Sequence, residues 1–256
     1  MARKLKKDNN YFEVIDSEYK AYVLGFIFAD GTIYDGRTTD RPNRQLRLTI
    51  NCVESDSYVF DKFLEDNNDA SKMISIRKNR PNEQPISVIR ITSNKLCNDL
   101  IALGNRINKT YNGIAFPSLR EDLVRHFIRG FLDGDGSIMV NTSKYTYQRK
   151  SNYNLTKEPN LIKYRLRVAF INTDIEFLKT IESLLPITNA TYTSKGMCNT
   201  LWIESIDNVR KTISYLYDDA TIYLKRKRDK VDEYDRTISS QASDKSEEGS
   251  ETTCAV

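Results

Sequence analysis

Apolar and polar residues follow one another along this chain in two blocks that have the same order. Each block opens with an apolar run that ends in Asp-Gly, "AYVLGFIFADG" at residues 21–31 and "FIRGFLDGDG" at 127–136. A segment with an apolar residue at every second position follows, "RQLRLTIN" in the first block and "KYRLRVAF" in the second. The first pattern is typical of a helix and the second of a half-buried strand, so each block predicts a helix, a hairpin and a further helix.

The two blocks continue in parallel to their ends. Each adds two strand-like runs, "KMISIRKNR" and "PISVIRIT" in the first block and "NATYTSKG" and "NTLWIES" in the second. Each then closes with a short helix and an exit that carries lysine, "GNRINKT" or "TIYLKRKRDK". A repeat of this length predicts an α+β protein built from two pseudosymmetric αββαββα halves.

The repeat also sets the expected boundaries. We expect a first half at residues 1–108 with a basic N-terminal arm, a linker at 109–120, and a second half at 121–235. Pro117 discourages a continuous helix through the linker. Residues 236–256 are polar and nearly free of large apolar side chains, so we expect a disordered tail.

Composition excludes several classes of protein. No apolar run approaches the roughly 18 residues of a membrane span, and the start, "MARKLKKDNN", lacks the apolar stretch of a signal peptide. We therefore expect no membrane partner and an intracellular location, in a cytoplasm, an organelle matrix or a virus-infected host cell. The cysteines lie far apart and His126 is the only histidine, which supports neither a disulfide framework nor a zinc site.

The formal net charge is +4, and the polar tail is acidic, so the excess of positive charge lies in the folded body. A basic body favours a polyanionic partner only mildly. An ordinary soluble enzyme remains equally compatible with the charge alone.

Small residues on the two apolar helices predict how they meet. Gly25 and Ala29 share one helix face, as do Gly130 and Gly134, because residues four apart lie above one another. Small side chains there allow two helix backbones to approach closely, so we expect the helices to pack together at the seam between the halves. The glycine after each helix suits the left-handed residue that often closes one.

Asp30 and Asp135 would then lie at the negative ends of the two helices, where an anion is disfavoured by about 0.3 to 1 kcal/mol. Two such carboxylates also repel each other. A hard divalent cation between them would relieve both effects. Asp-Gly is also a common helix stop, and either copy alone favours that interpretation; two copies in equivalent places favour a shared metal site.

At these residues the chain resembles a known family. "VLGFIFADG" and "IRGFLDGDG" are similar to the two copies of the motif that names the LAGLIDADG homing endonucleases, in their single-chain form. The resemblance covers roughly residues 15–232 and implies halves packed through their motif helices, with antiparallel sheets that form a DNA-binding saddle. The first copy has Phe28 where an aspartate is usual and the second keeps Asp133. That position does not bind metal in the family, so we interpret Phe28 as a packing variation.

The resemblance implies a metal-dependent DNA endonuclease that acts as a monomer on a long, imperfectly palindromic target. Asp30 and Asp135, with the adjoining Gly31 and Gly136, would hold Mg²⁺, with Mn²⁺ as an alternative and Ca²⁺ as a non-catalytic substitute. Each half would cut one strand. The family's members occur in introns and other mobile elements, and this chain would be freestanding or intron-encoded.

Further site residues follow from the same resemblance. Glu54 and Asp174 match the polar position that orients the attacking water; a helix N-terminal acid that stabilises the dipole is an equally good interpretation. Lys109 and Lys225 are the best matches for the basic residue that stabilises the transition state. Lys227 is nearly as good a match as Lys225, because "KRKRDK" leaves the register ambiguous, and a solvated DNA-facing lysine is the alternative for either.

The exposed faces of the strands predict the DNA contacts. Long polar side chains alternate with apolar ones in both halves, a pattern that suits major-groove recognition as well as an ordinary solvent face. The expected DNA-binding residues are Arg44, Gln45, Arg47, Thr49, Asn51, Arg77, Lys78, Lys163, Arg165, Arg167, Lys195 and Lys227.

Other functions fit less well. A single histidine is too few for a histidine-metal nuclease, and the chain has no G-x-x-x-x-G-K-[ST] phosphate loop. The main alternative is an intron maturase, with intron RNA as its partner, or a catalytically inactive DNA- or RNA-binding protein of the same fold.

Overall fold

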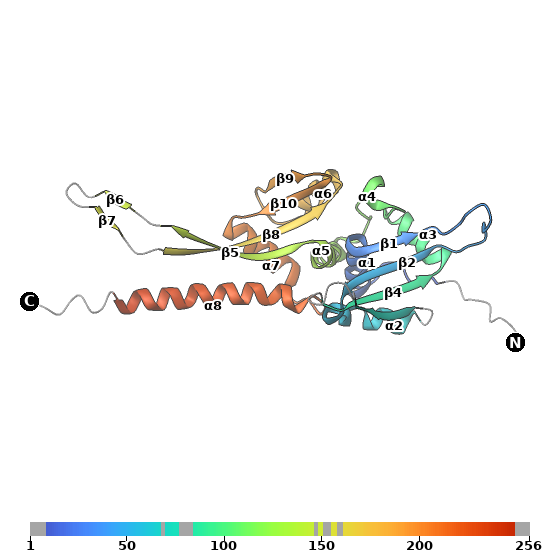
Figure 1. The fold of residues 1–256 in the computed structure, drawn as a ribbon, viewed down its shortest axis with the longest axis horizontal. Coiled ribbons are helices and arrows are strands. Elements are labelled where there is room, and N and C mark those ends of the chain that lie inside the picture. The colour runs from blue at the N-terminus through green and yellow to red at the C-terminus, as the bar shows by residue number, and fades with distance from the viewer. Residues whose placement is uncertain are drawn as a thin grey trace, which may run out of the picture.

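The computed structural model describes residues 9–67, 70–76, 84–145, 148–150, 155–157 and 161–248. It confirms two α+β halves, which lie on either side of a central pair of helices (Figure 1). The expected Arg77 and Lys78 lie outside the described residues.

The first half contains the elements that the repeat predicts. Ser17 begins its first helix, where the side-chain oxygen accepts a hydrogen bond from the amide of Lys20. In chain order the elements are α1 (Glu18–Asp30), β1 (Gly31–Tyr34), β2 (Arg47–Val53), η1 (Glu54–Phe60), α2 (Asp61–Asp66), β3 (Ser71–Ser75), β4 (Ile86–Thr92), α3 (Asn94–Ala102) and α4 (Lys109–Asn112).

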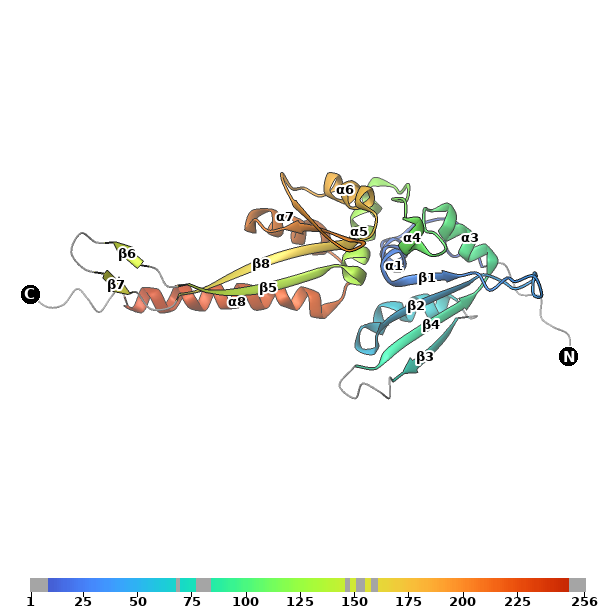
Figure 2. The same ribbon diagram turned by 45° about the horizontal axis from the view of Figure 1, so that its top comes forward.

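The second half repeats this order and lengthens its first hairpin, whose strands project away from the centre of the molecule (Figure 2). A small two-stranded sheet, β6 with β7, extends that hairpin. In chain order the elements are α5 (Glu121–Asp135), β5 (Ser137–Tyr145), β6 (Gln148–Lys150), β7 (Leu155–Lys157), β8 (Leu161–Asn172), α6 (Ile175–Leu184), β9 (Thr191–Lys195), β10 (Cys198–Ile203), α7 (Ile206–Tyr217) and α8 (Lys225–Glu248).

The two main sheets are antiparallel and have equivalent strand orders, β1-β2-β4-β3 and β5-β8-β10-β9. In each sheet the strand that leaves the motif helix pairs with the next long strand: Gly31 lies opposite Ile50, and Ser137 lies opposite Ala169. Alternate residues of β2 are buried, as the sequence predicts, with Leu48 and Ile50 on the core side. The opposite face of the sheet is therefore left for polar side chains.

Helices α1 and α5 pack directly on each other, as predicted, and their glycines make this possible. A Cβ atom on Gly25 would lie 2.0 Å from the carbonyl oxygen of Phe127, and one on Gly130 would lie 1.9 Å from that of Tyr22. No side chain fits in these spaces. The seam is therefore a backbone-to-backbone contact that places the C-terminal ends of both helices together.

The prediction of a left-handed glycine after each helix is wrong. Gly31 has φ −77° and Gly136 has φ −87°, so both adopt extended backbone and begin the next strand. Glycine is required here by crowding instead, because a Cβ atom would lie 2.5 Å from the carbonyl oxygen of Ile27 in one half and 2.7 Å from that of Leu132 in the other. The helices therefore pass into β1 and β5 without a turn.

Residues 236–248, where a disordered tail was expected, are helical; the rest of that expected tail, residues 249–256, lies outside the described residues. Helix α8 continues from Lys225 to Glu248 and lies beside the long β5–β8 hairpin (Figures 1 and 2). Buried Val231 and Tyr234 anchor it on the second half, which the sequence pattern of scattered apolar residues did not reveal. None of the helices in the described part of the chain is both long and apolar enough to span a membrane.

Candidate active site

Asp30 and Asp135 meet where α1 and α5 end, and a hydrogen bond joins their side chains. Burial and the neighbouring Asp135 together raise the pKa of Asp30 to about 7, against the opposing effect of Lys109 and Lys227. Burial likewise raises the pKa of Asp135. The unfavourable carboxylate pair that the two motifs predicted is therefore present at the seam.

A lysine covers the end of each of these helices. The ammonium group of Lys109 donates to the carbonyl oxygens of Ile27 (3.4 Å), Phe28 (2.7 Å) and Ala29. In this way it binds the last turn of α1, where the final carbonyls of a helix lack intrahelical donors; the carbonyl of Ile27 also accepts from the amide of Gly31. Burial lowers the pKa of Lys109 to about 8, while the two aspartates act in the opposite direction.

Lys227 does the same for α5. Its Nζ donates to the carbonyl oxygens of Leu132 (2.6 Å), Asp133 (2.7 Å) and Gly136 (2.7 Å). Burial lowers its pKa to about 8 as well. Because an ammonium group has only three N–H donors, both lysines use all of them on backbone oxygens and contribute fixed positive charge to the site.

The structure places Lys227, rather than Lys225, at the end of α5. Lys225 is exposed at the start of α8, and its Nζ lies 5.6 Å from the centre of the Tyr58 ring. Residues two apart on a helix point in different directions, so only one of Lys225 and Lys227 can face the end of α5. That residue is Lys227, which the sequence had left as the second choice and as a DNA contact.

Glu54 and Asp174 follow equivalent strands but differ in their contacts. Glu54 begins η1, is half-buried, and its amide donates to the carbonyl of Pro85 at 2.8 Å. Asp174 is the N-cap of α6, where its side chain accepts from the amides of Glu176 (3.0 Å) and Phe177 (3.3 Å). A capping function thus accounts for one oxygen of Asp174.

The donor set at the seam fits a hard divalent cation. In the part of the chain that the structure describes, no group of three or more His, Cys, Asp or Glu side chains comes together to hold a metal. The available ligands are the two carboxylates, with the remaining positions left for water or substrate oxygens, an arrangement that Mg²⁺ often adopts. The carbonyl of Gly136 already accepts a hydrogen bond from Lys227, which competes with its predicted use as a ligand.

Asp56 is a candidate that the sequence analysis missed. It lies in η1, is only 4% exposed, and accepts a hydrogen bond at 2.7 Å from Nε of Arg226 in the other half. It shares with Asp30 a pocket of about 210 Å³. A charged residue three positions after a strand end gives no sequence signal of this contact. The pocket is lined by Phe26, Asp30, Asn51, Cys52, Val53, Asp56, Ile86 and Arg226.

Each sheet places an arginine over an aromatic ring on its polar face. The guanidinium of Arg47 lies 5.0 Å from the centre of the Tyr34 ring, and that of Arg167 lies 4.2 Å from the Trp202 ring. Arg167 also forms an ion pair with Glu204. Among the residues that the structure describes, the buried Nε atoms of both arginines find no hydrogen-bond partner.

Apart from Lys227, the other predicted DNA contacts in the described residues lie on the strands or, for Arg44 and Gln45, just before β2. Arg90 of β4, which the sequence analysis omitted, lies opposite Thr49, and its buried Nε has no hydrogen-bond partner within the described ranges. The strand pattern "PISVIRIT" could have identified it, because Arg90 alternates with buried residues. The exposed residues are Arg44, Gln45, Asn51, Lys163, Arg165 and Lys195.

Comparison with known proteins agrees with this geometry. Residues 128–232 match the family model described as LAGLIDADG endonuclease. No curated protein sequence matches the chain. Among solved structures, the meganuclease I-AabMI bound to uncleaved DNA is similar, with 14% identity, a TM-score of 0.54, and coverage of 89% of this chain and 92% of that one.

I-SmaMI is similar to the same degree. Its complex with uncleavable DNA gives 13% identity, a TM-score of 0.56, and coverage of 90% of this chain and 92% of that one. Its complex with cleaved DNA gives 13% identity, a TM-score of 0.55, and coverage of 93% of both chains. At this identity the likeness shows the fold, and it extends over both halves.

Proposed function

We propose that this chain, whose second half belongs to the LAGLIDADG endonuclease family and whose whole fold is shared with LAGLIDADG meganucleases, is a site-specific double-strand DNA endonuclease. The observation that carries the proposal is the buried pair of Asp30 and Asp135, with a lysine at each helix end. Binding alone gives no reason to hold two repelling carboxylates at the seam, since a buried charge without a partner is costly.

The aspartates and the lysines of the site would have different roles. Asp30 and Asp135 would hold Mg²⁺, which when bound activates water and neutralises charge on the phosphate. Lys109 and Lys227 are fixed by backbone oxygens, so they offset the negative helix ends beside the carboxylates and add positive charge near a developing oxyanion. The carboxyls must lose their protons to bind the cation, so metal binding strengthens as the pH rises through about 7.

The two sheets supply recognition. Their polar faces carry Arg47 in one half and Arg167 in the other, each held over an aromatic ring. Arginine in the major groove pairs with the O6 and N7 atoms of guanine. Two halves with equivalent sheets suit a long target whose two half-sites are related by an imperfect twofold, bound by one copy of the chain.

The test is a selection of cleaved duplexes from a random or genomic DNA library in Mg²⁺. Wild type should yield one long, imperfectly palindromic target, and Asp30→Asn or Asp135→Asn should abolish double-strand cutting of it. Both variants should still bind that target in Ca²⁺. Binding without any cut in wild type, or tight binding to a structured intron RNA in place of DNA, would overturn the proposal in favour of a maturase or an inactive binding protein.

A further inference from the structure

The connector, defined here as residues 221–226, joins α7 to the first turn of α8 and is held by side chains from both halves of the molecule. It begins one residue beyond a short turn and ends directly before Lys227. Connections of this kind usually run over the surface with solvated backbone groups. In this chain the connector's backbone groups are instead paired in succession with side chains.

The first half supplies part of these contacts. Glu18 of α1 accepts a hydrogen bond from the amide of Thr221 at 2.9 Å. The hydroxyl of Tyr58 in η1 donates to the carbonyl of Tyr223 at 2.9 Å and accepts from the amide of Lys225 at 2.8 Å. Asp56 completes the set through its ion pair with Arg226.

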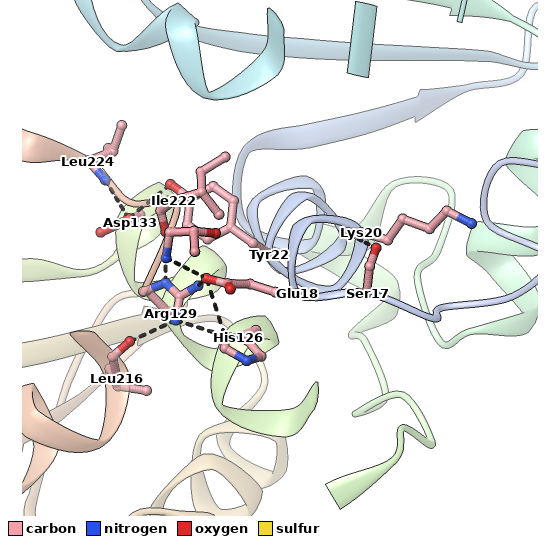
Figure 3. A network of polar contacts seen from close by, with 11 residues as sticks. Ser17, Glu18, Lys20, Tyr22, His126, Arg129, Asp133, Leu216, Ile222 and Leu224 are labelled. Atoms are coloured by element: carbon pink, nitrogen blue, oxygen red, sulfur yellow. Dashed lines mark hydrogen bonds and ion pairs between the residues drawn. The ribbon is translucent and has the colours of Figure 1, made fainter. Parts of the chain in front are cut away.

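The second half supplies the rest from α5 (Figure 3). Nε of Arg129 donates to the carbonyl of Ile222 at 2.9 Å, and Asp133 accepts from the amide of Leu224 at 2.8 Å. Arg129 and Asp133 are both 0% exposed. Buried charged groups of this kind have well-defined geometry because every alternative leaves one of them unpaired.

These buried residues are themselves tied to the first half. Arg129 donates from Nη2 to Glu18 at 2.6 Å, and Asp133 accepts from the hydroxyl of Tyr22 in α1 at 2.9 Å (Figure 3). Tyr217 of α7 donates to the other oxygen of Asp133 at 2.7 Å. The connector is therefore bound to a single polar network that spans the seam.

In the part of the chain that the structure describes, the other candidate active-site lysine, Lys109, has no comparable polar network around it. Phe28 occupies the position in α1 that Asp133 occupies in α5, and it packs against Phe127 with ring centres 5.2 Å apart. The polar contacts described for the chain just around Lys109 are local: Arg106 donates to the carbonyls of Ile101 and Asn105, and Asn112 donates to that of Ile107.

We propose that side chains from both halves position Lys227 through the connector, so that Asp56 and Tyr58 of the first half and Asp133 of the second are positioning residues for one of the two strand cuts. The inference rests on the proposed endonuclease activity. Lys227 lies within the first turn of α8, so a displacement of the connector moves its Nζ away from the end of α5. Lys109 is reached by a separate path, and its position is independent of the connector.

The decisive experiment follows both cuts on a duplex with a different label on each strand. Lys227→Met, which keeps the length of the side chain and removes its charge, identifies the strand that depends on Lys227. Tyr58→Phe and Asp56→Asn should slow the cut of that same strand about tenfold and change the other less than about twofold, an effect of the size expected for a misplaced charge. Tyr192→Phe is the matched control, because it removes a tyrosine hydroxyl that contacts Glu182, away from the connector; it should leave both rates unchanged.

Amide hydrogen exchange tests the positioning role of the connector without requiring that the protein cut DNA. The amides of Leu224 and Lys225 should exchange slowly in wild type, and Tyr58→Phe should accelerate exchange at Lys225 by at least tenfold while the core of α5 stays protected. Equal slowing of both strands, or a selective loss on the strand that Lys227→Met spares, would overturn the inference. If wild type cuts no DNA, the activity proposal fails, and unchanged exchange in Tyr58→Phe would then reject the connector's role as well.

Discussion

The two halves place a lysine at equivalent helix ends by different means. Lys109 begins the four-residue helix α4, directly after Asn108, whose φ of 53° is left-handed. Lys227 lies in the 24-residue helix α8 and follows the connector. Both nevertheless donate to the last carbonyls of the adjoining motif helix. The two halves are therefore equivalent in where they place the lysine charge, and they differ in the backbone segments that hold each lysine.

The side chains around the two equivalent seam positions, Phe28 and Asp133, also differ in chemistry. Around Phe28 the seam is apolar and aromatic, whereas around Asp133 it is a buried network of tyrosine hydroxyls, backbone amides and charges. An apolar core tolerates small shifts, while a buried carboxylate is stable only with its partners in place. The second half is therefore the more rigidly specified of the two at the active site.

The largest expected effect concerns the seam, where the halves should behave alike. Gly25→Ala and Gly130→Ala should each lower the free energy of unfolding by about 3 kcal/mol or more, because the added Cβ overlaps a carbonyl oxygen of the facing helix. Thermal or denaturant unfolding measures the loss. Gly196→Ala is the control: with φ of 62° and no atom of the described residues within 4 Å of the added Cβ, it should cost only about 1 kcal/mol. A loss at one seam glycine alone would show that the packing is not symmetric.

The second prediction concerns the lysines. Lys109→Met and Lys227→Met should each slow the cut of one strand about 100-fold, and the affected strands should be opposite, because each removes fixed charge from one helix end. Accumulation of nicked plasmid in Mg²⁺ measures the effect, and strand labels identify the nick. If both variants stop the same strand, the assignment of one lysine to each half is incorrect.

A smaller effect is expected on the sheet faces. Arg47→Lys and Arg167→Lys should each remove a guanine preference at one target position, and the two positions should be related by the target's pseudo-twofold. Loss of a bidentate contact lowers discrimination by about 1 to 3 kcal/mol, while the retained charge leaves the salt dependence of binding unchanged. Target profiling of bound duplexes in Ca²⁺ checks this. A uniform loss of affinity over all sequences would identify these residues as phosphate contacts.

The smallest expected effect is a gain in stability. The pKa of Asp30 is raised from its ordinary value to about 7, so the folded state holds the proton more tightly, and stability falls as the pH rises from about 4 to about 7. Above that window, Asp30→Asn should raise the free energy of unfolding of the metal-free protein by about 1 kcal/mol. Unfolding at pH 8 in the presence of a chelator measures it. The gain should shrink at pH 5, and in Mg²⁺ wild type should recover the difference.

The sequence predicted the fold well because its signals are local and occur twice. The Asp-Gly ends of the motif helices, the small residues at Gly25 and Gly130, and the alternation around Leu48 each act within one element and each have a counterpart. The sequence did not predict that α8 extends to Glu248. The residues that anchor this helix, Val231 and Tyr234, are isolated apolar residues in a polar segment. Their burial depends on the long β5–β8 hairpin, which no local pattern relates to them.

For the candidate active site too, part could be predicted from the sequence and part could not. Residue types and spacing alone determined that two acids lie at two helix ends, because helix geometry and the small-residue faces follow from neighbouring positions in the chain. Only the tertiary structure decided that Lys227 rather than Lys225 covers α5, that Asp56 meets Arg226, and that Asp133 binds the connector. These contacts join residues far apart in sequence, and their geometry is set by burial and by the need to pair each buried charge, which no short segment specifies.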